Sequence, residues 1–291
     1  MSEGAGAVVV LTASAERGLW DADIAAAARE LGLEAETPRR LGPAGAEIGV
    51  SAPPERLPAL VGIDVNVVPA VGRRKRLLIA DMDATMIPVE CIDEVAYAAG
   101  VGPKVAEITE AAMAGELDFE GALRARVALL EGLAEATLEA VYDARVALNP
   151  GGRTLVRTMA EAGAATALVS GGFTFFAERV GRAAGFAETQ ANRLLAAEGR
   201  LTGRVAEPIL GRAAKLEAMS RMLARDGLTP SEACALGDGA NDLAMIEAAG
   251  LGVGFRPKPA LAARADAVIR HGDLTAVLHL QGIHADQFVR D

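Results

Sequence analysis

The sequence predicts an α/β protein built on a doubly wound parallel sheet, with a helical cap insertion and a small N-terminal ferredoxin-like α/β module. After residue 150, apolar strand-like segments alternate with helix-like ones, which is the pattern of a parallel sheet covered on both faces. Residues 91–148 show helical periodicity alone, and residues 7–70 place β, α and β patterns close together. We therefore expect three parts, namely an N-terminal module (1–74), a core (75–90 and 149–291) and a helical cap (91–148).

The N-terminal module is expected to contain three strands and two helices. Val8–Leu11 is an apolar strand pattern, and Asp21–Leu31 has apolar residues at helical spacing. Two further strands are expected at Glu47–Ser51 and Ile63–Val68, with a short helix near Glu55–Leu60 between them. This order of elements in so few residues favours a ferredoxin-like unit.

The first core strand follows four consecutive cations, Arg73–Arg76. Such a run could bind phosphate or nucleic acid, but it is more often a solvated linker, and we favour the linker. Leu77–Ala80 is apolar without polar alternation, which predicts a parallel strand buried on both faces. Further strands of the same sheet are predicted at Ala165–Val169, Ala233–Leu236, Gly252–Phe255 and Ala267–Ile269.

The composition argues against several classes of protein. The chain has 291 residues, 51% of them hydrophobic, and a formal net charge of −10, which argues against non-specific nucleic-acid binding. Cys91 and Cys234 are far apart and belong to no Cys/His cluster, so we expect neither zinc nor a disulfide framework, and a reducing cytoplasm suits the chain. No apolar run reaches the ~18 residues of a membrane span. The sequence leaves a homodimer open.

Four polar clusters stand at or near the ends of predicted strands, where open parallel sheets bind their ligands. The first, Asp81 and Asp83, directly follows the first core strand. Two carboxylates at that spacing could hold Mg²⁺, and one could attack phosphorus while the other moves a proton. An Asp-rich turn that caps the next helix would have the same pattern.

The other three clusters are Ser170-Gly171-Gly172, Lys215 and Gly237–Asp242. The Ser170 hydroxyl and the Gly-flanked N–H groups could bind a phosphate oxygen at a helix N-terminus, and Lys215 could stabilise the charge of a phosphoryl group. Gly237–Asp242 combines two carboxylates and an amide in a tight turn. Each cluster alone could be an ordinary turn or a solvated charge, but their order along the chain favours a phosphate site.

Together the four clusters resemble the DxDxT, Ser/Thr, Lys and GDxxxD motifs of the haloacid dehalogenase superfamily. Longer stretches resemble the phosphoserine phosphatase family within it, and this resemblance covers about residues 75–291. Those stretches are Asp81–Glu94, Ala112–Phe119, Leu123–Val127, Ser170–Thr174, Leu201–Gly203 and Gly237–Asp242. The family usually has Ser where this chain has Ala84. The N-terminal module resembles ACT-like modules by element order only.

The resemblance implies a role for each site residue. Asp81 would be the nucleophile and Asp83 the general acid/base, with Mg²⁺ held by the Asp81 side chain, the Asp83 carbonyl and Asp238. The other implied roles are contacts with the substrate: Ser170, Gly171 and Lys215 would hold the phosphoryl group, Asn241 would contact the substrate, Glu90 would face its ammonium, Arg126 would bind its carboxylate, and Met113 and Phe119 would close the pocket.

The implied activity is Mg²⁺-dependent hydrolysis of O-phospho-L-serine through a phospho-aspartate intermediate, the last step of L-serine biosynthesis. Two alternatives stay open: another small phosphomonoester such as homoserine phosphate, or a regulatory protein that binds an amino acid or phospho-ligand through its N-terminal module. The presence of both Asp81 and Asp83 favours an enzyme with a small-molecule substrate, because a binding protein needs no nucleophile beside a proton donor.

Overall fold

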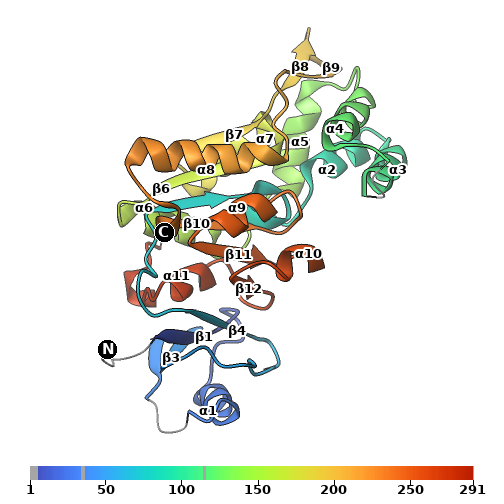
Figure 1. The fold of residues 1–291 in the computed structure, drawn as a ribbon. Helices are drawn as coiled ribbons and strands as arrows, with labels where there is room; N and C mark the ends of the chain where they lie inside the picture. Colours follow the sequence, from blue (N-terminus) through green and yellow to red (C-terminus); the bar gives the residue numbers. More distant parts are fainter. Residues whose placement is uncertain (1–5, 34–36, 114–115, 291) are drawn as a thin grey trace.

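The computed structural model describes residues 6–33, 37–113 and 116–290, and it confirms the predicted fold class. Figure 1 shows the N-terminal module at the bottom, a parallel sheet with its helices in the middle, and the helical cap at the upper right. Among the described residues, no helix is both long and apolar enough to cross a lipid bilayer. The residue boundaries that the sequence suggested for the three parts stay a prediction.

The core is a parallel sheet of six strands in the order β12-β11-β10-β5-β6-β7. Its central strand β5 pairs with β10 on one side and with β6 on the other. The four predicted core strands after β5 all form, and β7 is a strand that the sequence did not suggest. The bounds are β5 Leu77–Ala80, β6 Ala165–Phe173, β7 Glu188–Asn192, β10 Ala233–Gly237, β11 Leu251–Phe255 and β12 Ala267–Ile269.

Helices cover both faces of this sheet, and the side chains of β5 show how. Successive strand residues point to opposite faces, so Leu78 and Ala80 pack into one apolar cluster while Leu77 and Ile79 pack into another. The first cluster includes α6 (Gly152–Glu161), α7 (Thr174–Ala184) and α11 (Ala276–Leu280). The second includes α8 (Arg212–Asp226), α9 (Leu243–Ala248) and α10 (Pro259–Ala262). The strand is buried on both faces, as its unbroken apolar run predicted.

The cap consists of α2 (Cys91–Ala98), α3 (Gly102–Met113), α4 (Phe119–Ala128) and α5 (Glu135–Arg145). Its two connections to the core meet at Asn149, which donates its backbone N–H to the Met86 carbonyl and its side-chain amide to the Thr85 carbonyl, both at 2.8 Å. The core hairpin β8–β9 (Leu194–Ala197 and Arg200–Val205) also reaches the cap, because Leu201 exchanges backbone hydrogen bonds with Gly132 and Leu133. The hairpin therefore closes against the cap.

The N-terminal module is an antiparallel sheet in the order β2-β3-β1-β4 with α1 packed on one face. Its bounds are β1 Ala7–Ala13, α1 Asp21–Glu30, β2 Arg39–Gly42, β3 Gly45–Val50 and β4 Ile63–Pro69. The helix predicted near Glu55–Leu60 is wrong: this segment is irregular. Pro53, Pro54 and Pro58 explain the difference, because proline lacks an N–H and disfavours helical geometry in the residue before it.

The module is docked on the free edge of the core sheet. The Asn66 amide of β4 pairs with both backbone groups of Val268 in the edge strand β12, at 2.8 and 3.0 Å. The buried Asp64 carboxylate accepts the N–H groups of residues 270–272 at 2.7–3.2 Å. Side chains of the module thus occupy an edge that would otherwise expose unpaired backbone groups.

The first residue of the basic run belongs to the same junction. The Arg73 side chain is 9% exposed, pairs with Glu47 at 2.7 Å and donates to the carbonyls of His279 and Leu280. The solvated-linker interpretation is therefore wrong for Arg73, although Arg74 and Arg76 are exposed. A buried guanidinium needs a paired carboxylate, and Glu47 supplies one from a strand that is distant in the sequence.

Candidate active site

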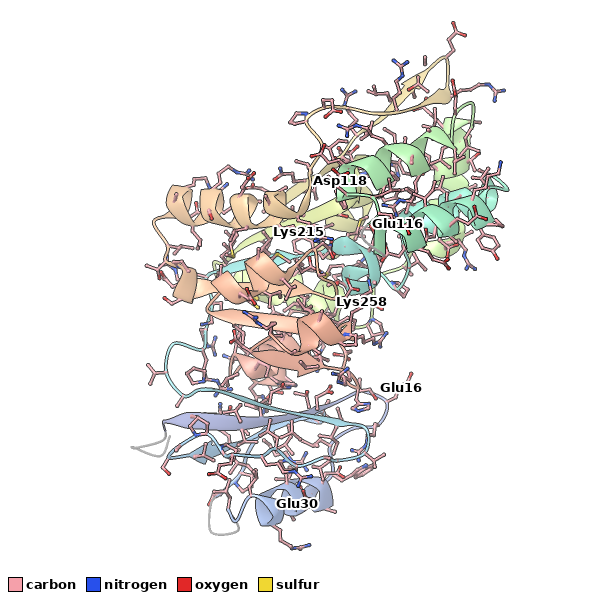
Figure 2. The ribbon with its side chains drawn as sticks, turned by 45° about the vertical axis from the view of Figure 1, so that its right-hand side comes forward. Glu16, Glu30, Glu116, Asp118, Lys215 and Lys258 are labelled. Carbon is pink, nitrogen blue, oxygen red and sulfur yellow. The ribbon has the colours of Figure 1, made fainter. Side chains whose placement is uncertain are left out.

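The predicted polar clusters meet at the carboxyl end of the parallel strands. Asp81 follows β5, Ser170 lies near the end of β6, and Asp238 follows β10. Lys215 enters from α8. Figure 2 shows Lys215 and Lys258 at the end of the sheet that faces the cap. The topology of the sheet therefore brings together residues that are far apart in the sequence.

Asp81 is 4% exposed and is held by three donors. Its Oδ1 accepts the N–H of Met82 at 2.7 Å and contacts the Lys215 ammonium at 2.7 Å. Its Oδ2 accepts the Asn241 side-chain amide at 3.3 Å. These contacts fix the orientation of a buried carboxylate, which is the requirement for a nucleophile that must reach phosphorus along one line.

Lys215 also pairs with Asp242, whose Oδ1 lies 2.5 Å from Nζ. Burial opposes the ammonium form, but the carboxylates of Asp81 and Asp242 raise the pKa of Lys215. Burial and the charge of Asp81 raise the pKa of Asp242 to about 7. The second Asp242 oxygen accepts the N–H groups of Asp238 and Gly239 at 3.1 Å. Asp242 therefore positions both the lysine and the tight turn after β10, a role that the sequence did not assign although the residue closes the GDxxxD motif.

Three carboxylates at the strand ends could share a cation. One oxygen each of Asp81, Asp238 and Asp242 lies within 4.8 Å of the others. Asp81 and Asp242 each accept from three donors, whereas the contact of the Asp238 carboxylate among the described residues is with Lys258, so Asp238 has the freest oxygens. Hard carboxylate oxygens fit Mg²⁺ rather than a softer metal. The prediction of Asp81 and Asp238 as ligands is thus compatible with the geometry. The predicted ligand from Asp83 is its backbone carbonyl, and its carboxylate is not a member of this cluster.

Asp83 has a different environment from Asp81. Its Oδ1 accepts the N–H of Cys91 at 3.1 Å, and its Oδ2 lies 3.5 Å from the Ser170 hydroxyl. The chain turns sharply just after it, with Ala84 in the left-handed region at φ 53°. Burial and the charge of Asp81 raise the pKa of Asp83 to about 6. A carboxyl group that binds a proton near neutral pH can act as a general acid and then as a base.

Ser170 and Gly171 lie on a strand rather than at a helix N-terminus. β6 continues to Phe173 and α7 begins at Thr174, so these residues form the last part of the strand that leads into the helix. The Ser170 hydroxyl accepts the N–H of Gly172 at 2.8 Å. A small cavity remains here, lined among others by Phe119, Ser170, Gly171, Lys215 and Asn241, all of which the sequence had selected.

Phe119 of the cap closes this cavity. A Cβ added to Gly171 would lie 3.0 Å from the Phe119 ring, so the aromatic ring rests on the backbone of the core. The absence of a side chain at position 171 leaves room for this close approach. Met113 ends α3, and its side chain lies outside the described part of the chain.

Glu90 and Arg126 bring opposite charges to the cap side of the site. Glu90 is open to solvent, but the protein around it still limits its hydration, and together with the nearby Asp83 carboxylate this raises the pKa of Glu90 to about 8. Arg126, in the last turn of α4, donates Nε–H to the Ala122 carbonyl at 3.2 Å. Burial lowers the pKa of Arg126, and the charges of Asp93 and Glu90 oppose that shift. Glu90 is thus within electrostatic reach of both the strand ends and Arg126.

Two further site residues were not selected from the sequence. The Lys258 ammonium lies 3.2 Å from the Asp238 carboxylate, and Cys91 contacts Asp83. Lys258 could have been found by the rule that identified the other clusters, since it follows β11 closely in the sequence. Cys91 could not, because an isolated buried cysteine has no chemical signature in a sequence.

Comparisons by family model, by sequence and by structure find relatives of the same kind. Residues 78–247 match the family model of haloacid dehalogenase-like hydrolases. A phosphoserine phosphatase of Streptomyces coelicolor is 45% identical over 231 residues, which are 79% of this chain but just 56% of that protein. A phosphoserine phosphatase of Polaromonas sp. strain JS666 is 44% identical over 210 residues, covering 70% of this chain and 89% of that protein. A solved structure of a substrate-bound phosphoserine phosphatase has a TM-score of 0.66 and 36% identity, covering 71% of this chain and 98% of that one.

Proposed function

The chain belongs to the haloacid dehalogenase-like hydrolases and, within them, to the phosphoserine phosphatase family, and from this premise we propose that it hydrolyses O-phospho-L-serine to L-serine and phosphate, the last step of L-serine biosynthesis. The observation that carries the proposal is the contrast between two carboxyl groups on one strand end. The Asp81 side chain contacts the Lys215 ammonium at 2.7 Å, whereas Asp83 is the carboxyl group whose pKa is raised to about 6. Their environments suit a nucleophile and a proton donor respectively.

In the proposed reaction an Asp81 oxygen attacks phosphorus, and the bond from phosphorus to the serine oxygen breaks. Asp83 gives its proton to the departing serine oxygen, so that serine leaves as a neutral alcohol. Asp83, now a carboxylate, then takes a proton from a water molecule that attacks phosphorus and releases phosphate from Asp81. The same residue acts as acid and then as base, which returns the enzyme to its starting state.

The phosphoryl oxygens would be bound by the Ser170 hydroxyl, the Gly171 N–H and the Lys215 ammonium. These groups are already oriented by their neighbours, so little reorganisation is needed as charge moves onto the phosphoryl oxygens. Mg²⁺, held by the Asp81 side chain, the Asp83 carbonyl and Asp238, would supply further positive charge to the transferring group.

Specificity for serine would come from the cap. Glu90 would pair with the substrate ammonium, and Arg126 would bind its carboxylate with two parallel hydrogen bonds. Asn241 would contact the substrate from the core, while Phe119 and Met113 would exclude water from the closed site. A reducing cytoplasm is the proposed location, since Cys91 and Cys234 are free and buried.

The test is a panel of phosphomonoesters with the purified chain. Phosphate release is measured from phosphoserine, phosphothreonine and homoserine phosphate, with Mg²⁺ and with excess chelator. We expect phosphoserine to give the highest kcat/KM and the chelator to abolish turnover. Asp81→Asn keeps the shape of the side chain but should lower kcat on the order of 10⁴-fold. A preference for homoserine phosphate would replace the substrate, and an Asp81→Asn variant with a tenth of normal turnover would refute the covalent route.

A further inference from the structure

Asp83 is anchored by a residue of the cap rather than by the core. Its Oδ1 accepts the backbone N–H of Cys91 at 3.1 Å, and the Cys91 thiol lies close enough to the same carboxyl group to affect its pKa. Cys91 is 0% exposed and is the first residue of α2, the helix with which the cap begins. One residue thus gives the carboxyl group a backbone donor and places a thiol beside it, at the point where the chain leaves the core.

We propose that Cys91 is a positioning residue that orients the Asp83 carboxyl group for proton transfer to the departing alcohol. The inference deepens the proposed function and rests on it. Cys91 acts through Asp83 and does not touch the phosphoryl group.

The geometry separates the two oxygens of Asp83. With Oδ1 bound to Cys91, Oδ2 is directed toward the end of β6, where it lies 3.5 Å from the Ser170 hydroxyl. A Cβ on Gly172 would lie 2.7 Å from Oδ2, so the absence of a side chain at position 172 leaves space for that oxygen. Oδ2 is therefore the oxygen on the side of the residues that hold the phosphoryl group, and the oxygen from which a proton would be delivered.

Backbone chemistry explains why the anchor is at this position. The first N–H groups of a helix have no partner within the helix, and the N-cap residue of α2, Glu90, makes no side-chain capping bond. The Asp83 carboxylate, eight residues earlier, meets the need of the Cys91 N–H instead. The orientation of the proton donor and the position of the first cap helix are thus set by the same hydrogen bond.

The thiol is suited to donate and unsuited to react. Burial and the Asp83 carboxylate raise the pKa of the Cys91 thiol above its usual range, so the side chain stays protonated. A buried, neutral thiol is a poor nucleophile. A hydroxyl of similar size can replace its donor function, whereas a methyl group cannot.

Two leaving groups distinguish positioning of the acid from general damage. The serine alkoxide needs a proton as it departs, whereas p-nitrophenolate is a weak base and departs without one. We expect Cys91→Ala to lower kcat/KM for phosphoserine on the order of 10-fold, part of the 10²–10⁴-fold that general acids contribute, because the backbone N–H remains. For p-nitrophenyl phosphate the loss should stay within about twofold, since kcat/KM reports the steps up to leaving-group departure.

Two controls complete the experiment. Cys91→Ser restores a donor and should recover most of the activity on phosphoserine, while Cys234→Ala, at the other buried free cysteine, should change both substrates equally. In an Asp83→Asn background, Cys91→Ala should have no further effect on the ratio of the two substrates. Equal losses on both substrates, or an unchanged ratio, would overturn the positioning role. Wild-type protein that is inactive on phosphoserine would instead overturn the proposed function.

Discussion

Replacing Arg126 by alanine tests how the cap recognises the amino-acid end of the substrate. The guanidinium is partly buried in α4, and burial already lowers its pKa, so the charge is expensive unless the substrate carboxylate pairs with it. Truncating one partner of a buried charge pair costs about 2–5 kcal/mol. Because Arg126 keeps some exposure, we take the lower part of that range, about 2–3 kcal/mol, which corresponds to roughly a 30- to 150-fold loss of kcat/KM for phosphoserine.

The assay compares phosphoserine with phosphoethanolamine, which has the same phosphate and ammonium groups but no carboxylate. Arg126→Ala should lower kcat/KM for phosphoethanolamine by less than about threefold, because no carboxylate loses its partner. Arg124→Ala is a matched control: Arg124 lies on the same helix, is exposed and pairs with Glu120 and Glu207. The control should leave the ratio of the two substrates unchanged. Equal losses on both substrates in Arg126→Ala would show that this arginine is structural and that the carboxylate is read elsewhere.

Three further predictions concern the metal, the module junction and pH. Asp238→Ala should raise the Mg²⁺ concentration for half-maximal activity at least ~10-fold, the lower end of what even outer-shell partners contribute; an unchanged activation curve would exclude Asp238 as a ligand. Asp64→Ala leaves three N–H groups of residues 270–272 unpaired and should lower the free energy of unfolding, measured by urea titration, by about 2–4 kcal/mol. The control Asp21→Ala removes an exposed carboxylate and should lower it by less than about 1 kcal/mol. Burial lowers the pKa of His279, so below about pH 6.5 the unfolded chain binds more protons than the folded chain. The free energy of unfolding should therefore fall as the pH drops from about 6.5 toward the folded-state pKa of His279. His279→Gln should make this fall less steep, and a fall as steep as that of the wild type would refute the prediction.

The residues at the strand ends could be predicted from the sequence because the pattern that identifies them lies within a few consecutive residues. An unbroken apolar run such as Leu77–Ala80 predicts a buried parallel strand, and polar residues directly after such runs must meet at one edge of the sheet. Asp81, Ser170 and Asp238 follow that rule, and the structure brings them together. Lys258 follows it too and was overlooked because a single lysine after a strand is usually solvated.

Elements whose place depends on distant partners could not be predicted in the same way. The hairpin at residues 194–205 has weak strand patterns and is held by backbone bonds to Gly132 and Leu133 of the cap. The side chain of Arg73 is buried because Glu47 and the carbonyls at the end of α11 surround it. Neither partner is near in sequence, and a run of cations gives no sign of which member will be paired.

The two sides of the proposed site differ in what fixes them, and this has a consequence for specificity. The residues that would attack and hold the phosphoryl group, Asp81 and Lys215, are placed at the strand ends and pair with each other, so a change in either should affect every phosphomonoester alike. Glu90 and Arg126 stand on or beside cap helices whose positions depend on packing. A substitution there should redistribute activity among substrates without abolishing phosphoryl transfer. A phosphatase with the same strand ends and different cap charges is therefore expected to keep the reaction and to change the molecule on which it acts.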